Sequence, residues 1–453
     1  MDELLRLGSC KLVEFAKKPE YRWIKPDWNI VMSKTLLISR AVLDGRTADV
    51  LIEGNRIKKI SVAPVEGTFD RTIDARDKIL VPPFYNGHTH AAMNLLRGFA
   101  DDLQLMDWLQ NHIWPAEAHL DDSIVYAGTR LSILEMIKSG TVFFNDMYWY
   151  APAVLRAAED MKVRAAIARQ AIETSPGVNN PTNVESNTAL EAMIGSCSGR
   201  VFLTYAPHAI YTVCGDSLRE MHGKAAAEKS YYHIHVAETR TEMETCAKLH
   251  GGMTPVAYLD SLGVLDERTI MAHCVHLTDD DIRIIREHGA VVVHNAQSNL
   301  KLDSGFFPFK RAVEDGGCRT ILGTDGCCSN NSMSMFSEMK TAALLAKTVA
   351  DDPTVAPAAR ILKMATADGA AAFGIDAGVI AEGKLADAML LDASSSLLVP
   401  GFNLASDMVY AADSSCVDTV ICDGNVLMEG RKVPGEGEII SAAREAAARL
   451  VRG

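Results

Sequence analysis

Residues 79–90 of the chain read ILVPPFYNGHTH, an apolar run that ends in two histidines separated by one threonine. The run has the β-branched and aromatic content of a buried strand. Side chains two residues apart on a strand point to the same face, so His88 and His90 would present both imidazoles together. Two imidazoles at the end of one strand form half of a metal site. This stretch therefore predicts the first strand of the fold and the start of its functional site.

Further apolar, β-rich runs follow, and segments with helical periodicity, such as 123–139 and 151–161, separate them. The complete set of runs is Ile79–His88, Thr141–Met147, Arg164–Arg169, Val201–His208, Tyr231–Glu238, Thr269–Val275, Ala290–Ala296 and Thr320–Gly326. Strands alternating with helices over roughly 250 residues or more are typical of a closed (β/α)₈ barrel, a TIM-like α/β fold. An open doubly wound sheet is the alternative. Such a sheet is expected to have a glycine-rich, phosphate-binding turn after its first strand, and the sequence has none there.

The segments on either side of these runs have a different pattern. Residues 35–60, 377–392 and 418–433 resemble short antiparallel strands with hairpin turns such as Asp44-Gly45 and Asp423-Gly424. We predict a small β-sandwich built from residues 32–80 and 377–435, around a catalytic barrel of residues 81–376. Residues 1–31 would be an N-terminal extension and residues 436–453 a C-terminal helix.

Composition restricts the partners. The formal net charge of the 453 residues is −13, which argues against nucleic acid as a partner because an acidic surface repels phosphates. No segment has the roughly 18 consecutive apolar residues of a membrane span. Asp2 and Glu3 precede any apolar stretch, the wrong charge order for a secretory signal, so we expect a cytoplasmic protein with no membrane partner. None of the ten cysteines has C-x-x-C spacing, which disfavours a cysteine zinc site.

Polar residues end three of the later runs. His235 ends the fifth run, His273 the sixth and Asp325 the eighth. In a (β/α)₈ barrel the carboxyl ends of the strands meet at the catalytic face. Together with the two histidines of the first strand they make an N/O site suited to one divalent ion, Zn²⁺ or alternatively Fe²⁺. Glu238 lies three residues after His235, where a carboxylate could act as general acid and base.

The motifs HTH (88–90), IHVAET (234–239), AHCVHL (272–277), HNAQSNLKL (294–302) and LGTDGCCSNNS (322–332) together resemble the amidohydrolase superfamily. Within it the chain is similar to the 5′-methylthioadenosine/S-adenosylhomocysteine deaminases, from about Leu36 to Val433. The resemblance implies hydrolytic deamination of a small adenine nucleoside at C6. It also implies a barrel that often self-associates, so a homo-oligomer is an expected assembly.

The resemblance implies a role for each motif residue. His88, His90, His235 and Asp325 would be the metal ligands, and His273 would hydrogen-bond the attacking oxygen. Asp325 would accept the proton of the attacking water, and Glu238 would protonate N1 and then the leaving amine. Some relatives use two metals bridged by a carbamylated lysine on the fourth strand. The stretch 201–208, VFLTYAPH, has no lysine, so a single metal is expected.

Substrate contacts are implied in the same way. Glu117 would accept hydrogen bonds from the ribose 2′,3′-diol, which suits a carboxylate because charge-assisted hydrogen bonds are strong. His208 would touch the purine, and Arg169 would reach the 5′ side of the substrate. The remaining substrate contacts would be Trp108, Ser329, Glu238 and Asp325.

The sequence departs from the resembled family at one place. Relatives that accept S-adenosylhomocysteine carry a second arginine in the loop after the third strand, whereas residues 170–199 contain no arginine or lysine. A neutral 5′ group, as in adenosine, 5′-deoxyadenosine or 5′-methylthioadenosine, therefore fits at least as well.

Two other interpretations stay open at this point. A related hydrolase could act on guanine, an oxidised purine, cytosine or a chlorinated triazine, none of which has a diol for Glu117 to hold. The second alternative is not an enzyme but a non-catalytic scaffold protein with a barrel fold. Metal analysis would identify it, because such a protein should hold no stoichiometric metal ion.

Overall fold

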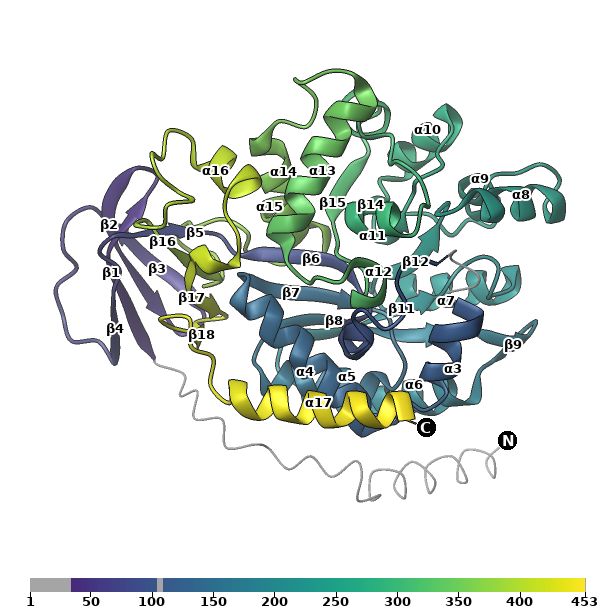
Figure 1. The fold of residues 1–453 in the computed structure, drawn as a ribbon, viewed down its shortest axis with the longest axis horizontal. Coiled ribbons are helices and arrows are strands. Elements are labelled where there is room, and N and C mark those ends of the chain that lie inside the picture. Colours follow the sequence, from purple (N-terminus) through teal and green to yellow (C-terminus); the bar gives the residue numbers. More distant parts are fainter. Residues whose placement is uncertain (1–33, 104–108, 453) are drawn as a thin grey trace.

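The computed structural model describes residues 34–103 and 109–452, and its centre is a parallel eight-stranded sheet (Figure 1). The strands lie in the order β15-β14-β13-β12-β11-β8-β7-β6. Their bounds are β6 (Phe84–Thr89), β7 (Thr141–Asp146), β8 (Arg164–Ala171), β11 (Val201–Pro207), β12 (Tyr232–Val236), β13 (Thr269–His273), β14 (Val291–His294) and β15 (Arg319–Leu322).

The first and last strands of this sheet meet at a seam. The Asn86 amide on β6 donates to Thr324 Oγ1 at 2.7 Å and accepts from the Thr324 N–H at 3.0 Å. One residue further along, the Asp325 N–H donates to the His88 carbonyl at 3.0 Å. The sheet is thus nearly closed on itself, and the predicted barrel is confirmed.

Helices lie between the strands and cover the sheet (Figure 1). The longer ones are α4 (Asp122–Lys138), α5 (Ala151–Asp160), α6 (Pro181–Ile194), α7 (Gly215–Ala227), α8 (Arg240–Leu249), α10 (Asp279–His288), α13 (Met335–Ala350) and α17 (Glu436–Arg452). Shorter ones are α3 (Trp114–Glu117), α9 (Pro255–Ser261), α11 (Ala296–Lys301), α12 (Cys327–Asn330), α14 (Ala358–Ala365), α15 (Ala367–Ala372) and α16 (Leu404–Tyr410). None of the helices in the described ranges combines the length and the apolar character of a membrane span.

Local sequence explains where several helices begin. The Asp121 side chain caps α4 by accepting from the Ile124 N–H. Thr278 and Asp281 form a reciprocal capping box at the start of α10. Helix α10 ends at Gly289, whose φ of 68° is the left-handed conformation that glycine adopts without strain.

The two flanking segments pair into a second sheet, which confirms the small β-structure predicted from both ends of the chain. Its strands are β1 (Thr35–Leu43), β2 (Arg46–Glu53), β3 (Arg56–Ser61), β4 (Arg71–Asp74), β5 (Lys78–Val81), β16 (Ala388–Asp392), β17 (Val417–Cys422) and β18 (Asn425–Met428). The order is β18-β17-β16-β5-β1-β2-β3, with β4 beside β1. The predicted domain limits stay predictions, and the extension 1–31 lies outside the described residues.

The run 79–88, predicted as one strand, is two strands in the structure. Pro82 and Pro83 follow β5, which pairs antiparallel with β16 in the flanking sheet, and β6 then enters the barrel. A proline has no N–H to donate to a ladder, so two in succession end one strand and separate it from the next. The stretch therefore connects the two sheets.

A buried polar cluster joins the barrel to the flanking sheet. Arg164, the first residue of β8, donates to Asp387 from Nε at 2.7 Å and from Nη2 at 3.0 Å. Arg164 Nη2 also donates to Asp423 Oδ1, and the Tyr85 hydroxyl donates to Asp387 Oδ2 at 2.9 Å. We call Tyr85, Arg164, Asp387 and Asp423 the junction cluster.

Candidate active site

Four histidines and one aspartate converge at the carboxyl ends of the barrel strands. His88 Nε2 and His90 Nε2 each lie 3.3 Å from Asp325 Oδ1, and His235 Nε2 lies 3.3 Å from His90 Nε2. His88, His90 and His235 form one group able to hold a metal ion, and His88, His273 and Asp325 form another. In each group the donor atoms lie within 4.8 Å of one another. The structure thus brings together the predicted ligands, and their binding of a metal stays a prediction.

The tautomers of these histidines suit metal binding. His90 Nδ1 and His235 Nδ1 each face a backbone carbonyl, that of Met147 and that of His208 respectively. A carbonyl only accepts, so each Nδ1 carries the proton and each Nε2 presents a lone pair to the shared centre. His88 Nε2 is buried and has no hydrogen-bond partner among the residues that the structure describes. A divalent ion would satisfy all three atoms.

Burial also keeps these ligands in the right charge state. It lowers the pKa of His88 to about 4 and that of His235 well below the ordinary value, so both imidazoles are neutral at pH 7. Burial alone would raise the pKa of Asp325, but the neighbouring His88, His90 and His273 outweigh it and hold that pKa well below its usual range. Neutral imidazoles around one carboxylate form the donor set expected for zinc.

Asp325 is oriented by two hydroxyl groups. Its Oδ2 accepts from Ser298 Oγ at 2.6 Å and from Ser329 Oγ at 3.0 Å, which leaves Oδ1 toward the histidines. Ser329 was predicted to contact substrate, and in the structure its hydroxyl contacts the aspartate. Sequence reasoning missed Ser298, although it lies within the HNAQSN motif.

Glu238 and His273 lie beside the ligand group. His273 Nε2 is 3.9 Å from Glu238 Oε2, and Ser304 Oγ is 3.4 Å from Glu238 Oε1. His273 Nδ1 lies 2.8 Å from Asn299 Oδ1, which fixes the imidazole ring. Burial disfavours the charged ring, but Glu238 and Asp325 outweigh it and raise the pKa of His273. The pair is therefore suited to exchanging protons next to the metal ligands.

Glu117 is held by two aromatic residues that follow β7. The Tyr148 hydroxyl donates to Glu117 Oε1 at 2.6 Å, and Trp149 Nε1 donates to Oε2 at 3.4 Å. The Tyr148 ring lies 6.2 Å from the His90 ring, which puts this carboxylate beside the ligand group. Burial raises the pKa of Glu117. Trp108, predicted as a neighbouring contact, lies outside the described residues.

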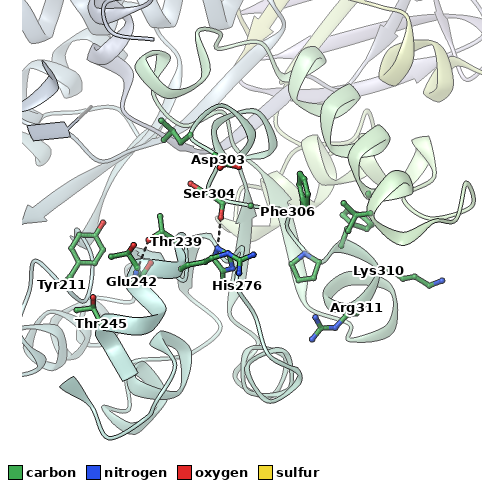
Figure 2. A pocket seen from close by; sticks show the side chains of 18 of the residues that line it. Tyr211, Thr239, Glu242, Thr245, His276, Asp303, Ser304, Phe306, Lys310 and Arg311 are labelled. Carbon is green, nitrogen blue, oxygen red and sulfur yellow. Dashed lines mark hydrogen bonds between the residues drawn. The ribbon is translucent and has the colours of Figure 1, made fainter. Parts of the chain in front are cut away.

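His208 lies between the ligand group and a large cavity. Its ring is 4.8 Å from that of His235, and its Nδ1 is 3.0 Å from Thr212 Oγ1. The cavity has a volume of about 1200 Å³ and lies over the loops that follow β11 to β14. Figure 2 shows Tyr211 on one side of it and Arg311 on the other. Burial lowers the pKa of His208 to about 3, so the ring is a neutral hydrogen-bonding group.

The structure places Arg169, which is predicted to reach the substrate, among partners on the outer side of the barrel. Its guanidinium lies 3.4 Å from Glu191, 3.2 Å from Glu228 and 4.6 Å from the Tyr205 ring centroid, between β8 and the outer helices. Side chains alternate along a strand, so Arg169 faces outward where Gln170 faces inward. Gln170 is buried, and its Oε1 has no partner within the described ranges.

Two further buried residues support the ligands. His233 Nε2 lies 2.9 Å from His88 Nδ1, and Asn145 Nδ2 lies 3.2 Å from His233 Nδ1. Asn145 also donates to the Gly87 carbonyl at 2.9 Å. Such outer partners orient ligating imidazoles. The alternation of β12 could have identified His233, because it is two residues before His235 and shares its face.

A model of the amidohydrolase family matches residues 79–427, which is more than half of the chain. The chain belongs to the amidohydrolase family. Among curated amidohydrolase relatives, the 5′-deoxyadenosine deaminase of Methanothermobacter thermautotrophicus is 43% identical, covering 92% of this chain and 98% of that protein. The 5-methylthioadenosine/S-adenosylhomocysteine deaminase of Syntrophomonas wolfei is 41% identical, covering 89% of this chain and 94% of that protein.

Solved structures of the family have the same fold. An adenosine deaminase from Xanthomonas campestris, crystallised with bound zinc, is similar with a TM-score of 0.86 and 33% identity. The match covers 92% of this chain and 99% of that one. The chain thus shares its fold, over almost all of its length, with a member of this metal-dependent family that was crystallised with zinc.

Proposed function

We propose that this protein is a zinc-dependent deaminase that replaces the C6 amino group of an adenine nucleoside with oxygen. The observation that carries the proposal is the convergence of ligand-competent imidazoles, Asp325, Glu238 and Glu117 at one end of the barrel. The relatives named above are adenine nucleoside deaminases, which favours the same substrate class here.

His88, His90, His235 and Asp325 would hold the ion. When bound, it supplies Lewis-acid chemistry that lowers the pKa of water from near 16 to about 7, so that hydroxide is available at neutral pH. The chain orients this site through Ser298 and Ser329 on Asp325, and through backbone carbonyls on His90 and His235.

The protein's own groups then move two protons. Asp325 accepts a proton from the attacking water, and Glu238 delivers one to N1, which makes C6 more electrophilic. The water oxygen bonds to C6, and His273, held by Asn299, donates a hydrogen bond to it. Glu238, now a carboxylate, takes the second water proton from the new C6 hydroxyl and passes it to the amine. The C6–N bond then breaks as the C6=O bond forms, and ammonia leaves. The proton held by Asp325 returns to Glu238, which restores both groups. Of the two water protons, one ends on N1 of the inosine product and one on ammonia.

The surroundings favour a substrate with a neutral 5′ group. Glu117 would accept a hydrogen bond from each ribose hydroxyl, because a carboxylate has two acceptor oxygens. Arg169 is occupied by Glu191 and Glu228, and residues 170–199 offer no other cation for an amino-acid carboxylate. We therefore rank 5′-deoxyadenosine, 5′-methylthioadenosine and adenosine above S-adenosylhomocysteine.

Ammonia release by purified, metal-analysed protein tests the proposal. The panel contains the four nucleosides, free adenine, guanine, cytosine and a chlorinated triazine. We expect turnover of nucleosides but not of free adenine, with about one metal ion per chain. Turnover of only a free base or the triazine would refute the nucleoside assignment, and protein without metal or activity would indicate a non-catalytic barrel.

A further inference from the structure

A buried carboxylate lies directly behind Glu238. Glu242 is the third residue of α8 and is only 5% exposed, although glutamate is rarely buried without a specific partner. Figure 2 shows it beside Thr239 at the wall of the cavity. Among the residues that the structure describes, it makes no hydrogen bond to a predicted metal ligand, and the proposed chemistry does not use it.

The partners of Glu242 are two consecutive backbone amides. Its Oε1 accepts from the Ala237 N–H at 2.9 Å and its Oε2 from the Glu238 N–H at 2.8 Å. Both donors follow the end of β12 at Val236, so no neighbouring strand supplies their acceptors. A buried N–H without a partner is strongly unfavourable. The carboxylate therefore satisfies both at once.

The backbone between these bonds is in an unusual conformation. Ala237 has a φ of 51°, in the left-handed region that alanine rarely adopts. This turn directs the Glu238 side chain back toward the metal ligands. Within the described part of the chain, the contacts of the Glu238 carboxylate are long, 3.4 Å to Ser304 and 3.9 Å to His273, so its position depends mainly on its backbone.

We propose that Glu242 is a positioning residue that holds the Ala237 turn and thereby directs Glu238 to the reacting atoms. The inference deepens the proposed function, and it rests on that function for the role of Glu238. Helix α8 contributes as well, because the Thr239 hydroxyl caps it by accepting from the Glu242 N–H at 3.1 Å. The loop and the first turn of α8 thus form one rigid unit.

The test compares zinc-loaded, full-length Glu242→Gln with wild type. A glutamine side chain has one acceptor oxygen for two N–H groups, and its amide N–H₂ opposes the second donor. We expect kcat to fall roughly 10- to 100-fold, as for a misplaced proton-transfer group, while KM and metal content change less than about twofold. Glu244→Gln is the matched control, because Glu244 is exposed on the same helix, and its kcat should match wild type.

A second variant separates positioning from simple destabilisation. Ala237→Gly introduces a residue that adopts positive φ without strain. Added to Glu242→Gln, it should recover part of the lost kcat, although it also makes the chain more flexible. If Glu242→Gln is not obtained folded, Glu242→Asp is measured in the same way, because its shorter side chain can reach only one of the two N–H groups.

Crystal structures of the same variants provide a readout that does not require activity. In Glu242→Gln the separation of Glu238 and His273 should increase by about 1 Å or more, a displacement large enough to impair catalysis. An unchanged Glu238, or a kcat within twofold of wild type, overturns the proposal. If wild type deaminates no nucleoside, the proposed function fails, while the displacement of Glu238 still decides the role of Glu242.

Discussion

The barrel has a buried polar cluster at each end, and the two differ in how their polar atoms are satisfied. In the junction cluster at the amino ends of the strands, Arg164 pairs with Asp387 and Asp423, and Arg200 adds a second cation 3.5 Å from Asp423. At the carboxyl ends, imidazole lone pairs converge on one point, and His88 Nε2 has no hydrogen-bond partner among the described residues. Charges matched by counter-charges indicate a structural role, whereas lone pairs that converge on one point indicate a binding site for a cation. The comparison predicts that substitutions at the carboxyl ends lower activity but not stability. Substitutions in the junction cluster should lower stability but not activity.

The largest expected effect is on activity at the carboxyl end. Glu238→Gln should lower kcat by roughly 10²- to 10⁴-fold, because general acid–base catalysis contributes that much. The metal content and the thermal midpoint should stay close to those of wild type, since Glu238 is not one of the predicted ligands. Steady-state kinetics, metal analysis and calorimetry check this. Loss of the metal with the activity would instead make Glu238 a ligand.

The next effect is on stability at the junction. Arg164→Met should lower the free energy of unfolding by about 3–5 kcal/mol, because it leaves the buried Asp387 without its cation. The kcat of the folded enzyme at low temperature should change little. Denaturant unfolding is the measurement. The control is Arg40→Met, which removes a half-exposed pair with Asp74 and should alter stability by less than about 1 kcal/mol.

A smaller effect is expected for substrate recognition. Glu117→Gln should lower kcat/KM for ribonucleosides roughly 10- to 100-fold, since hydrogen bonds to a charged acceptor contribute about 1.5–3 kcal/mol. The kcat/KM for the 2′,3′-dideoxy analogue should barely change, because this substrate offers no diol. Equal losses for both substrates would show that Glu117 supports the fold of the site rather than the ribose.

The smallest effect concerns Arg169. Arg169→Gln should leave kcat/KM for every neutral 5′ nucleoside within about twofold, because the guanidinium pairs with Glu191 and Glu228 on the outer helices rather than facing the predicted metal ligands. A tenfold or greater fall in kcat/KM that comes from a higher KM, with kcat unchanged, would show that the side chain reaches the substrate. Full kinetic curves for adenosine and 5′-methylthioadenosine distinguish the two outcomes.

The predicted site residues that the structure brings together lie at strand ends. His88, His90, His235, His273 and Asp325 could be grouped because parallel strands in a barrel deliver their last residues to one face. That rule needs only the approximate end of each strand. For Arg169 the rule is not sufficient, because the face that a side chain occupies alternates along a strand, and a shift of one residue reverses it.

The supporting contacts could not be predicted for a different reason. Ser298 on Asp325, Tyr148 on Glu117 and Glu242 on the Glu238 backbone depend on how loops are placed in three dimensions. Nothing in local periodicity specifies such partners. The break at Pro82 and Pro83, in contrast, was readable in the sequence, because consecutive prolines interrupt any hydrogen-bonded ladder.

The seam between β6 and β15 makes closure of the barrel and completion of the site a single event. The Asp325 N–H bonds the His88 carbonyl there, and the two residues are separated by most of the barrel sequence. During synthesis, no arrangement of the first seven strands contains the complete donor set, because Asp325 follows the last strand. A chain interrupted before residue 325 therefore carries the histidines without their carboxylate. The complete set of predicted metal donors forms only when the two ends of the sheet meet.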